Sequence, residues 1–278
     1  MARARALRIA LALAALGMAL PAAAADLRIL RDVAYGPDAR QRFDVYAPQD
    51  ARGAPVIFMV HGGGWAIGDK SNRGVVHNKT ARWLPRGFVF VSANYRMLPE
   101  ADPLEQARDV ARGLAAAQAQ AASWGGDPAR FILMGHSAGA HLVALIASAP
   151  GIALDLGARP WLGTVELDSA ALDVERIMRA RHLRLYDRAF GSDPAYWAKA
   201  SPLARLSATG APFLAVCSTR RADSCAAARD YAAKAQALGT RANVLEENLS
   251  HRQINEELGE HNAYTRAVEA FLDTLTAR

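Results

Sequence analysis

The pattern with the clearest chemical potential is a serine between two glycines, in Gly135-His136-Ser137-Ala138-Gly139. An apolar run, Phe131 to Met134, precedes it, and an apolar helical run, Ala140 to Ala149, follows. This context predicts a strand, a sharp turn and a helix, in which side chains at the two glycine positions would clash. The turn would lift the Ser137 hydroxyl to a helix N-terminus, whose partial positive charge favours a developing anion. Ser137 is therefore a candidate nucleophile.

A serine hydroxyl becomes a good nucleophile when a base takes its proton and a third group, normally a carboxylate, holds that base. With a serine on this kind of turn, the acid and then the histidine follow in the chain. Of the seven histidines, His251 and His261 come after a possible acid. His251 lies in a loop after the last expected strand, whereas His261 falls in the first turn of a terminal helix, facing water. We predict His251 as the general base.

The acid is expected after the strand Phe213 to Cys217. The loop that follows, 218–225, contains one carboxylate, Asp223, which we predict as the third member of the triad. A competing interpretation is that Asp223 caps the next helix, because aspartate is favoured at that position. Asp168 and Asp173, which follow an earlier strand, are the alternative acids.

The chain has two cysteines, Cys217 and Cys225, eight positions apart. In an exported chain such a pair around one loop favours a disulfide, which would restrain the loop that carries Asp223. Two separate buried thiols are the alternative. No spacing of cysteine and histidine predicts a zinc site, and we expect no metal.

The oxyanion of an acyl-transfer reaction needs backbone N–H donors. Gly62-Gly63-Gly64 follows a strongly apolar strand, Val56 to Val60, and glycines let the backbone come close to a substrate. We predict Gly63 and Gly64 as donors, together with Ala138, whose amide comes directly after the nucleophile. A merely flexible loop is the alternative, but His61, Trp65 and the downstream serine motif argue against it.

The elements that would position these residues alternate between strands and helices from Pro55 onward, which predicts βαβ units and a mostly parallel sheet. Two extended segments before Pro55 suggest an edge hairpin. The segment Asp173 to Ser201 lacks clean periodicity, and we interpret it as a small insertion of short helices. We expect a single domain over residues 26–278, because the sequence contains no internal repeat or linker.

The first 25 residues have the pattern of a secretory signal peptide, with three arginines, an apolar segment and a small-residue site at Ala22 to Ala25. We expect cleavage near Ala25, and a periplasmic or secreted protein without a membrane span. Removal of this segment lowers the formal net charge of +6 by three. The remaining arginines are scattered, so a nucleic-acid partner is not expected. The oligomeric state is left open.

Four motifs together resemble the α/β-hydrolase superfamily, and within it the hormone-sensitive-lipase-like and feruloyl/acetyl-esterase-like carboxylesterases. The motifs are His61-Gly62-Gly63-Gly64-Trp65, Asn94-Tyr95-Arg96, Gly125-Gly126-Asp127-Pro128 and Gly135 to Gly139. Over about residues 40 to 275, the resemblance implies an α/β-hydrolase fold with an eight-stranded, mostly parallel sheet flanked by helices. It also implies acyl transfer through a serine ester, without a metal or organic cofactor.

The function expected from these residues is hydrolysis of short-chain or aryl carboxylic esters by a serine carboxylesterase. The segment Gly135 to Leu142 also resembles arylformamidases, which makes N-formylkynurenine hydrolysis an alternative. The signal peptide and the third glycine, Gly64, argue against that role. A non-catalytic binding protein with the same fold is a third hypothesis, although such proteins usually lack the serine or the histidine.

Overall fold

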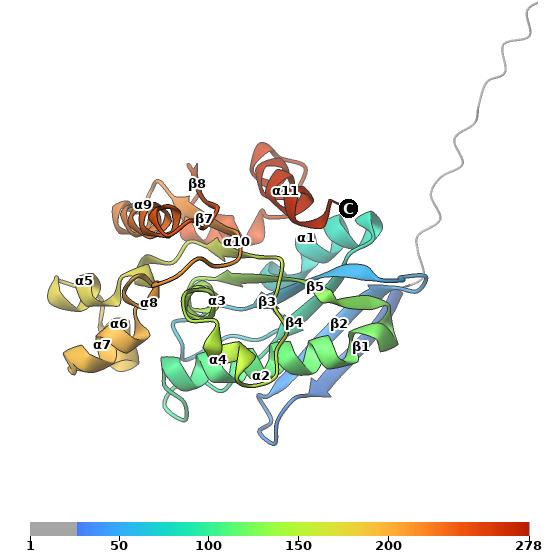
Figure 1. Ribbon diagram of the computed structural model, residues 1–278, viewed down its shortest axis with the longest axis horizontal. Helices are drawn as coiled ribbons and strands as arrows, with labels where there is room; N and C mark the ends of the chain where they lie inside the picture. The colour runs from blue at the N-terminus through green and yellow to red at the C-terminus, as the bar shows by residue number, and fades with distance from the viewer. Residues whose placement is uncertain (1–26, 278) are drawn as a thin grey trace, which may run out of the picture.

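A computed structural model describes residues 27–277, so the predicted signal peptide lies outside the described residues. Its centre is an eight-stranded sheet in the order β1-β2-β4-β3-β5-β6-β7-β8 (Figure 1). The first pairings, β1 with β2 and β2 with β4, are antiparallel, and all the others are parallel. The strands are β1 Leu27–Ala34, β2 Arg42–Pro48, β3 Ala54–Val60, β4 Val89–Ala93, β5 Gly126–His136, β6 Gly163–Leu167, β7 Phe213–Ser218 and β8 Ala242–Glu247.

Helices cover both faces of the sheet, as the predicted βαβ units require. The main helices are α1 Arg73–Trp83, α2 Pro103–Gln120, α3 Ala138–Ser148, α9 Ala222–Ala237 and α11 Ala263–Thr276, and shorter ones are α4 Gly151–Leu154 and α10 His251–Glu256. The fold class predicted from the sequence is confirmed. None of the helices within residues 27–277 is long and apolar enough to span a membrane.

Alternation along the central strands assigns each helix to a face, because successive side chains of a strand point to opposite sides. On β3, Val56 and Phe58 belong to the core beneath α2 and α3. Ile57 and Met59 instead belong to the core beneath α1 and α11. A third cluster joins α9 to the edge of α3 and to β7. The strand ends that carry the functional loops therefore lie between two apolar layers, one on each face of the sheet.

The irregular segment after β6 forms short helices, as the sequence suggested. They are α5 Val174–Arg179, α6 Arg184–Phe190, α7 Pro194–Ala200 and α8 Pro202–Arg205. In Figure 1 they lie together beside α3, apart from the sheet. This insertion packs its aromatic side chains onto the loop after β3, where Trp65 lies 5.9 Å from Tyr186 and 5.0 Å from Phe190 between ring centroids.

Candidate active site

Ser137 occupies the sharp turn between β5 and α3. Its backbone is strained, with φ 57° and ψ −116°, a conformation that L-residues rarely adopt. A Cβ at Gly135 would lie 2.4 Å from the Gly139 carbonyl oxygen, and one at Gly139 would lie 2.3 Å from that of Val60. Both glycines are therefore required by close backbone approach, as their spacing predicts.

The glycine loop after β3 lies directly against this turn. A Cβ at Gly62 would come within 2.8 Å of both Ser137 Cβ and the His136 carbonyl oxygen. Gly63 and Gly64 have positive φ values of 125° and 58°, and no hydrogen bond of the described residues outside helices and strands uses their amides as donors. The Ala138 amide is the first of α3, where N–H groups have no partner within the helix. The structure thus places the loop that carries Gly63 and Gly64 against the turn of the serine, and the Ala138 amide directly after it.

Replacing Gly62 with alanine is expected to lower kcat/KM for p-nitrophenyl acetate about 100-fold, the effect of losing an oxyanion donor. The added methyl would push the glycine loop away from Ser137, because no room exists for it. Gly151→Ala is a matched control, since its nearest neighbour, Asp155 Oδ2, is 3.6 Å away. Wild-type rates in Gly62→Ala would show that the close contact has no functional role.

Buried polar contacts brace the glycine loop. The Trp65 indole N–H donates to His141 Nδ1 at 3.2 Å, and His141 Nε2 donates to the Ala200 carbonyl at 2.8 Å. His141 is therefore neutral, and its burial lowers its pKa to about 4. This chain of contacts ties the loop to α3 and to the end of α7. On the other side, the Tyr95 hydroxyl donates to the His61 carbonyl at 3.0 Å.

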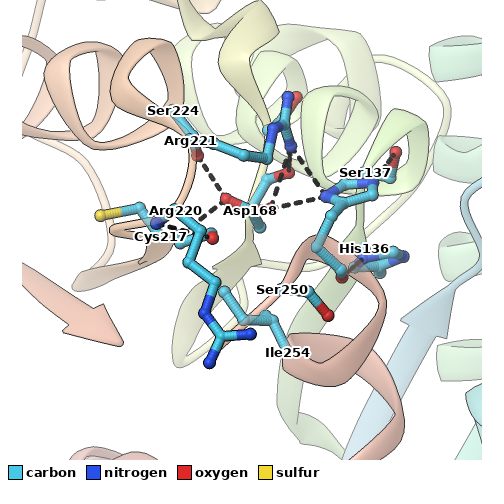
Figure 2. A network of polar contacts seen from close by, with 12 residues as sticks. His136, Ser137, Asp168, Cys217, Arg220, Arg221, Ser224, Ser250 and Ile254 are labelled. Atoms are coloured by element: carbon cyan, nitrogen blue, oxygen red, sulfur yellow. Dashed lines mark hydrogen bonds and ion pairs between the residues drawn. The ribbon is translucent and has the colours of Figure 1, made fainter. Parts of the chain in front are cut away.

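His251 lies at the start of α10, and its two ring nitrogens face the two partners that a general base needs. Ser137 Oγ is 2.9 Å from Nε2, and Asp168 Oδ2 is 2.5 Å from Nδ1. Because an ionised carboxylate only accepts hydrogen bonds, Nδ1 carries the proton and Nε2 is free to accept one from the serine. Figure 2 shows these contacts converging between Ser137 and Asp168.

The acid in this arrangement is Asp168, which follows β6, and the prediction of Asp223 is wrong. Asp223 lies in the first turn of α9, where its side chain is 61% exposed and accepts from the Ser224 amide. Its carboxylate faces solvent because α9 begins at Ala222, so that no loop remains to turn it toward the histidine. Asp173, the other alternative, caps α5.

Asp168 is fully buried and is held by donors on every side. The Ser218 amide and the Ser224 hydroxyl donate to Oδ1 at 2.8 and 2.5 Å. The Arg221 guanidinium donates to Oδ2 at 2.9 Å. Burial by itself would raise the pKa of Asp168, but the hydrogen bonds from His251, Ser224 and Ser218, with the charge of Arg221, hold it well below its ordinary value. Asp168 is therefore ionised while the base works.

A second carboxyl group two residues earlier has the opposite state. Glu166 is buried in β6, and burial raises its pKa well above the ordinary value, with a contribution from the charge of Asp168. Its Oε1 accepts from the Ser169 amide at 2.5 Å, whereas Oε2 has no partner among the described residues. A neutral Glu166 thus holds the turn that carries Asp168 without adding a second negative charge.

The sequence contained a signal for Asp168, which was among the alternative acids. Gly163 to Leu167 is buried throughout, and Asp168 is the first residue after it, at the carboxyl edge of the sheet. Its φ of 58° turns the side chain out of the strand direction and toward His251. That backbone conformation is set by contacts from β7 and α9, which are distant in the sequence.

Cys217 and Cys225 form a disulfide with an S–S distance of 2.01 Å. The loop that it closes, 218–224, supplies three of the donors to Asp168, from Ser218, Arg221 and Ser224. The Ser218 hydroxyl and the Arg220 guanidinium also donate to the Leu249 and Asn248 carbonyls, just before His251. The disulfide loop therefore holds both the acid and the segment that carries the base, although it does not contain the acid itself.

Replacing Cys217 and Cys225 together with alanine is expected to lower the free energy of unfolding by about 2–3 kcal/mol, the chain-entropy value for so short a loop. The turnover number should fall more than KM rises, because the loop positions Asp168 rather than substrate. Urea unfolding and steady-state kinetics, each with and without a reductant, measure the two effects. A variant with wild-type stability and turnover would contradict this role.

Three further sets of contacts hold His251 and the helix α10 that begins with it. Ser250 caps α10 in a capping box with Gln253. His136 Nε2 donates to the His251 carbonyl at 2.9 Å, and the two rings lie 4.5 Å apart between centroids. Lys79, buried in α1, donates to Asn255 O and Oδ1 at 2.6 and 3.0 Å, at the other end of α10. Burial lowers the pKa of Lys79 to about 7.

The remaining sequence predictions concern single residues. His61 and His136, which lie in the glycine and serine motifs, contact the backbone carbonyls of Gly62 and His251. His261 is exposed and contacts Arg82, far from the serine in this arrangement. Among residues 27–277, no group of three or more His, Cys, Asp or Glu side chains could hold a metal ion.

The sheet order is that of an α/β-hydrolase fold, and Ser137, His251 and Asp168 form a Ser-His-Asp triad within it. Residues 43–155 of the chain match the BD-FAE family model. The chain is 37% identical over 118 residues to a probable isoprenylcysteine alpha-carbonyl methylesterase of Oryza sativa subsp. japonica, covering 42% of this chain and 27% of that protein. It is 32% identical over 198 residues to esterase LipQ of Mycobacterium tuberculosis, covering 66% and 46%.

Among solved structures, the fold matches esterase B of Lactobacillus rhamnosis with a tributyrin phosphonate inhibitor, at a TM-score of 0.71 and 18% identity. The match covers 90% of this chain and 86% of that one. The chain spans less than half the length of the two curated relatives named above. Both relatives are named as esterases.

Proposed function

We propose that this protein is a serine carboxylesterase that hydrolyses short-chain or aryl carboxylic esters through an acyl-serine intermediate. The observation that carries the proposal is the single histidine placed 2.9 Å from the Ser137 hydroxyl and 2.5 Å from a buried, ionised carboxylate. The relatives that match the chain are esterases, which favours ester over formamide hydrolysis.

In the first half of the reaction, Ser137 Oγ attacks the ester carbonyl carbon while its proton passes to His251 Nε2. The carbonyl oxygen becomes an oxyanion, and the amides of Gly63, Gly64 and Ala138 stabilise it. Asp168 stabilises the imidazolium that forms. The C–O bond to the alcohol then breaks, the alcohol takes the proton from Nε2, and an acyl ester of Ser137 remains.

In the second half, water attacks the acyl-serine and gives its proton to His251 Nε2. The tetrahedral intermediate collapses, the bond to Ser137 Oγ breaks, and the serine recovers the proton as the carboxylic acid leaves. The same three amide donors and the same base serve both halves, so the site needs no further group for this chemistry.

Three aromatic side chains of the insertion and of the loop after β3 are mostly structural. Trp65 is 3% exposed and Tyr186 is 9% exposed, and both pack with Phe190. The Trp197 indole N–H donates to the Phe190 and Gly191 carbonyls. These rings therefore serve mainly to pack the insertion against the loop after β3.

A panel of p-nitrophenyl esters of increasing chain length, with methyl ferulate, acetylated xylan and N-formylkynurenine, tests the proposal. We expect the highest kcat/KM among the short-chain or aryl esters and a much lower rate on the formamide. A fluorophosphonate probe should label the folded protein at Ser137. Faster turnover of N-formylkynurenine than of every ester would establish the arylformamidase alternative, and no labelling would favour a non-catalytic binding protein.

We further propose that the protein is exported, on the basis of the signal-peptide pattern in residues 1–25. The Cys217–Cys225 disulfide supports this location, because disulfides persist in oxidising compartments. Fractionation of expressing cells, with N-terminal sequencing of the product, would test it. An uncleaved protein in the cytoplasm would contradict it.

A further inference from the structure

Arg221 stands beside the triad, although the reaction derived above does not use it. It lies in the disulfide loop, one residue before α9, and its side chain is 26% exposed. Its Nη1 is 2.9 Å from Asp168 Oδ2 and 2.8 Å from His251 Nδ1. Figure 2 shows Arg221 directed at Asp168 and the neighbouring Arg220 directed away from it.

Asp168 does not need this donor to be satisfied. Its Oδ1 already accepts from Ser218 and Ser224, and its Oδ2 accepts from His251. A fourth donor that carries a full positive charge therefore does more than complete a hydrogen-bond count. It places a cation next to Nδ1 of His251. When the imidazole is protonated, its own positive charge lies beside that cation.

The short distance between Arg221 and Nδ1 also bears on which ring nitrogen of His251 carries the proton. A guanidinium only donates, so it can hydrogen-bond to Nδ1 only when that nitrogen carries no proton. The productive arrangement has the Nδ1 proton directed at Asp168 and the Arg221 hydrogen on Asp168 as well. In that arrangement the cation and the imidazole face each other without a hydrogen bond, and protonation of the ring brings two like charges together.

Resting on the esterase function proposed above, we infer that Arg221 is a positioning residue that holds Asp168 and, by its charge, disfavours protonation of His251, so that the base stays free at lower pH. The cation should extend activity toward acidic conditions. The charge of Arg221 would then set how far the acid limb of the pH profile extends toward low pH.

The other groups that face His251 do not supply this effect. His136, packed against the ring from β5, is neutral, because burial and the neighbouring His251 lower its pKa to about 3. Asp168 acts in the opposite direction by favouring the protonated ring. Lys79 lies behind His136 and contacts the far end of α10. Asp223 approaches only the outer side of Arg221, at 3.8 Å.

The size of the effect follows from the surroundings of Arg221. Its outer side faces a cavity of about 470 Å³, whose wall includes Tyr186, Ile177 and Leu183 from the insertion. Contact with solvent through this cavity screens part of the charge. A charge within about 4–6 Å shifts a titration by about 1–3 pH units when the charges are opposite. We take the same scale for like charges, and screening favours the lower end of this range.

The test compares Arg221→Met with Arg221→Lys and Arg229→Met by pH profiles of kcat/KM on p-nitrophenyl acetate. We expect the acid limb of Arg221→Met to move to higher pH by about one unit. Arg221→Lys, which keeps the charge, should show little of this shift. Arg229→Met is a matched control, because Arg229 is exposed and pairs with Glu246 instead of contacting the triad or its supporting loop.

NMR titration of the His251 ring signal, assigned by its loss in His251→Gln, measures the pH at which the ring is half-protonated. This midpoint is obtained without any substrate. It separates failure of this inference from failure of the esterase proposal. A wild-type protein inactive on all esters would end the esterase proposal, and the NMR midpoint would still decide the role of Arg221. An unmoved midpoint and acid limb in Arg221→Met would overturn the inference, even if activity fell. If Arg221→Met does not fold, Arg221→Gln replaces it under the same criteria.

Discussion

Replacing Ser137 with alanine should reduce kcat on p-nitrophenyl acetate by at least about 10⁴-fold, because removal of the nucleophile ends covalent catalysis. Residual activity would come from binding and from the amides of Gly63, Gly64 and Ala138, which the substitution leaves in place. Stability should change little, since alanine keeps the backbone conformation of Ser137 and the substitution removes a single hydrogen bond, to His251. Fluorophosphonate labelling should disappear together with turnover.

Ser123→Ala is a suitable control, because Ser123 is exposed and its hydroxyl bonds only to the Gln120 carbonyl. It should keep wild-type kcat and labelling. Undiminished turnover in Ser137→Ala, at matched far-ultraviolet circular dichroism, would remove the serine from the mechanism and with it the proposed esterase reaction.

Replacing Asp168 with asparagine should lower kcat by about 10³–10⁴-fold with a much smaller change in KM. An asparagine amide in this place can donate to Nδ1, which leaves the ring proton on Nε2 and prevents that nitrogen from accepting the serine proton. The variant also removes the charge that pairs with Arg221 and stabilises the imidazolium. Steady-state kinetics and thermal unfolding of the purified variant separate the loss of catalysis from a loss of folding.

Asp223→Asn is the matched control, since the same chemical change is made at an exposed carboxylate in the first turn of α9. We expect its kcat within about twofold of the wild type, the result for a surface position away from the reacting atoms. A larger loss in Asp223→Asn than in Asp168→Asn would contradict the arrangement of the triad described here.

The residues that the sequence predicted well are those whose role depends on their immediate neighbours. Gly135 and Gly139 are needed because a turn of five residues leaves no room for their Cβ atoms. The glycines at 62–64 and the Asn94 to Arg96 motif likewise follow strands whose apolar character is visible in the sequence. His251 could be chosen because it directly follows the last strand, at the same sheet edge as the serine.

The acid illustrates what the sequence could not decide. Asp168 and Asp223 each follow a buried strand, and each is a plausible partner for a histidine by chain order alone. The choice depends on where α9 begins, on the loop that the Cys217–Cys225 disulfide closes, and on the left-handed backbone of Asp168. The position of Asp168 is set by contacts from β7 and α9, which meet β6 only in the folded chain.

The same distinction applies to the electrostatics. The sequence by itself determined a serine nucleophile, a histidine after the last strand and a glycine loop, because local backbone geometry requires those residue types at those spacings. Tertiary structure alone decided that Asp168 is buried and ionised, that Glu166 is neutral two residues away, and that Arg221 faces the imidazole. Burial and charge proximity arise from the packing of distant segments, so the state of a titratable group cannot be read from its neighbours in the chain.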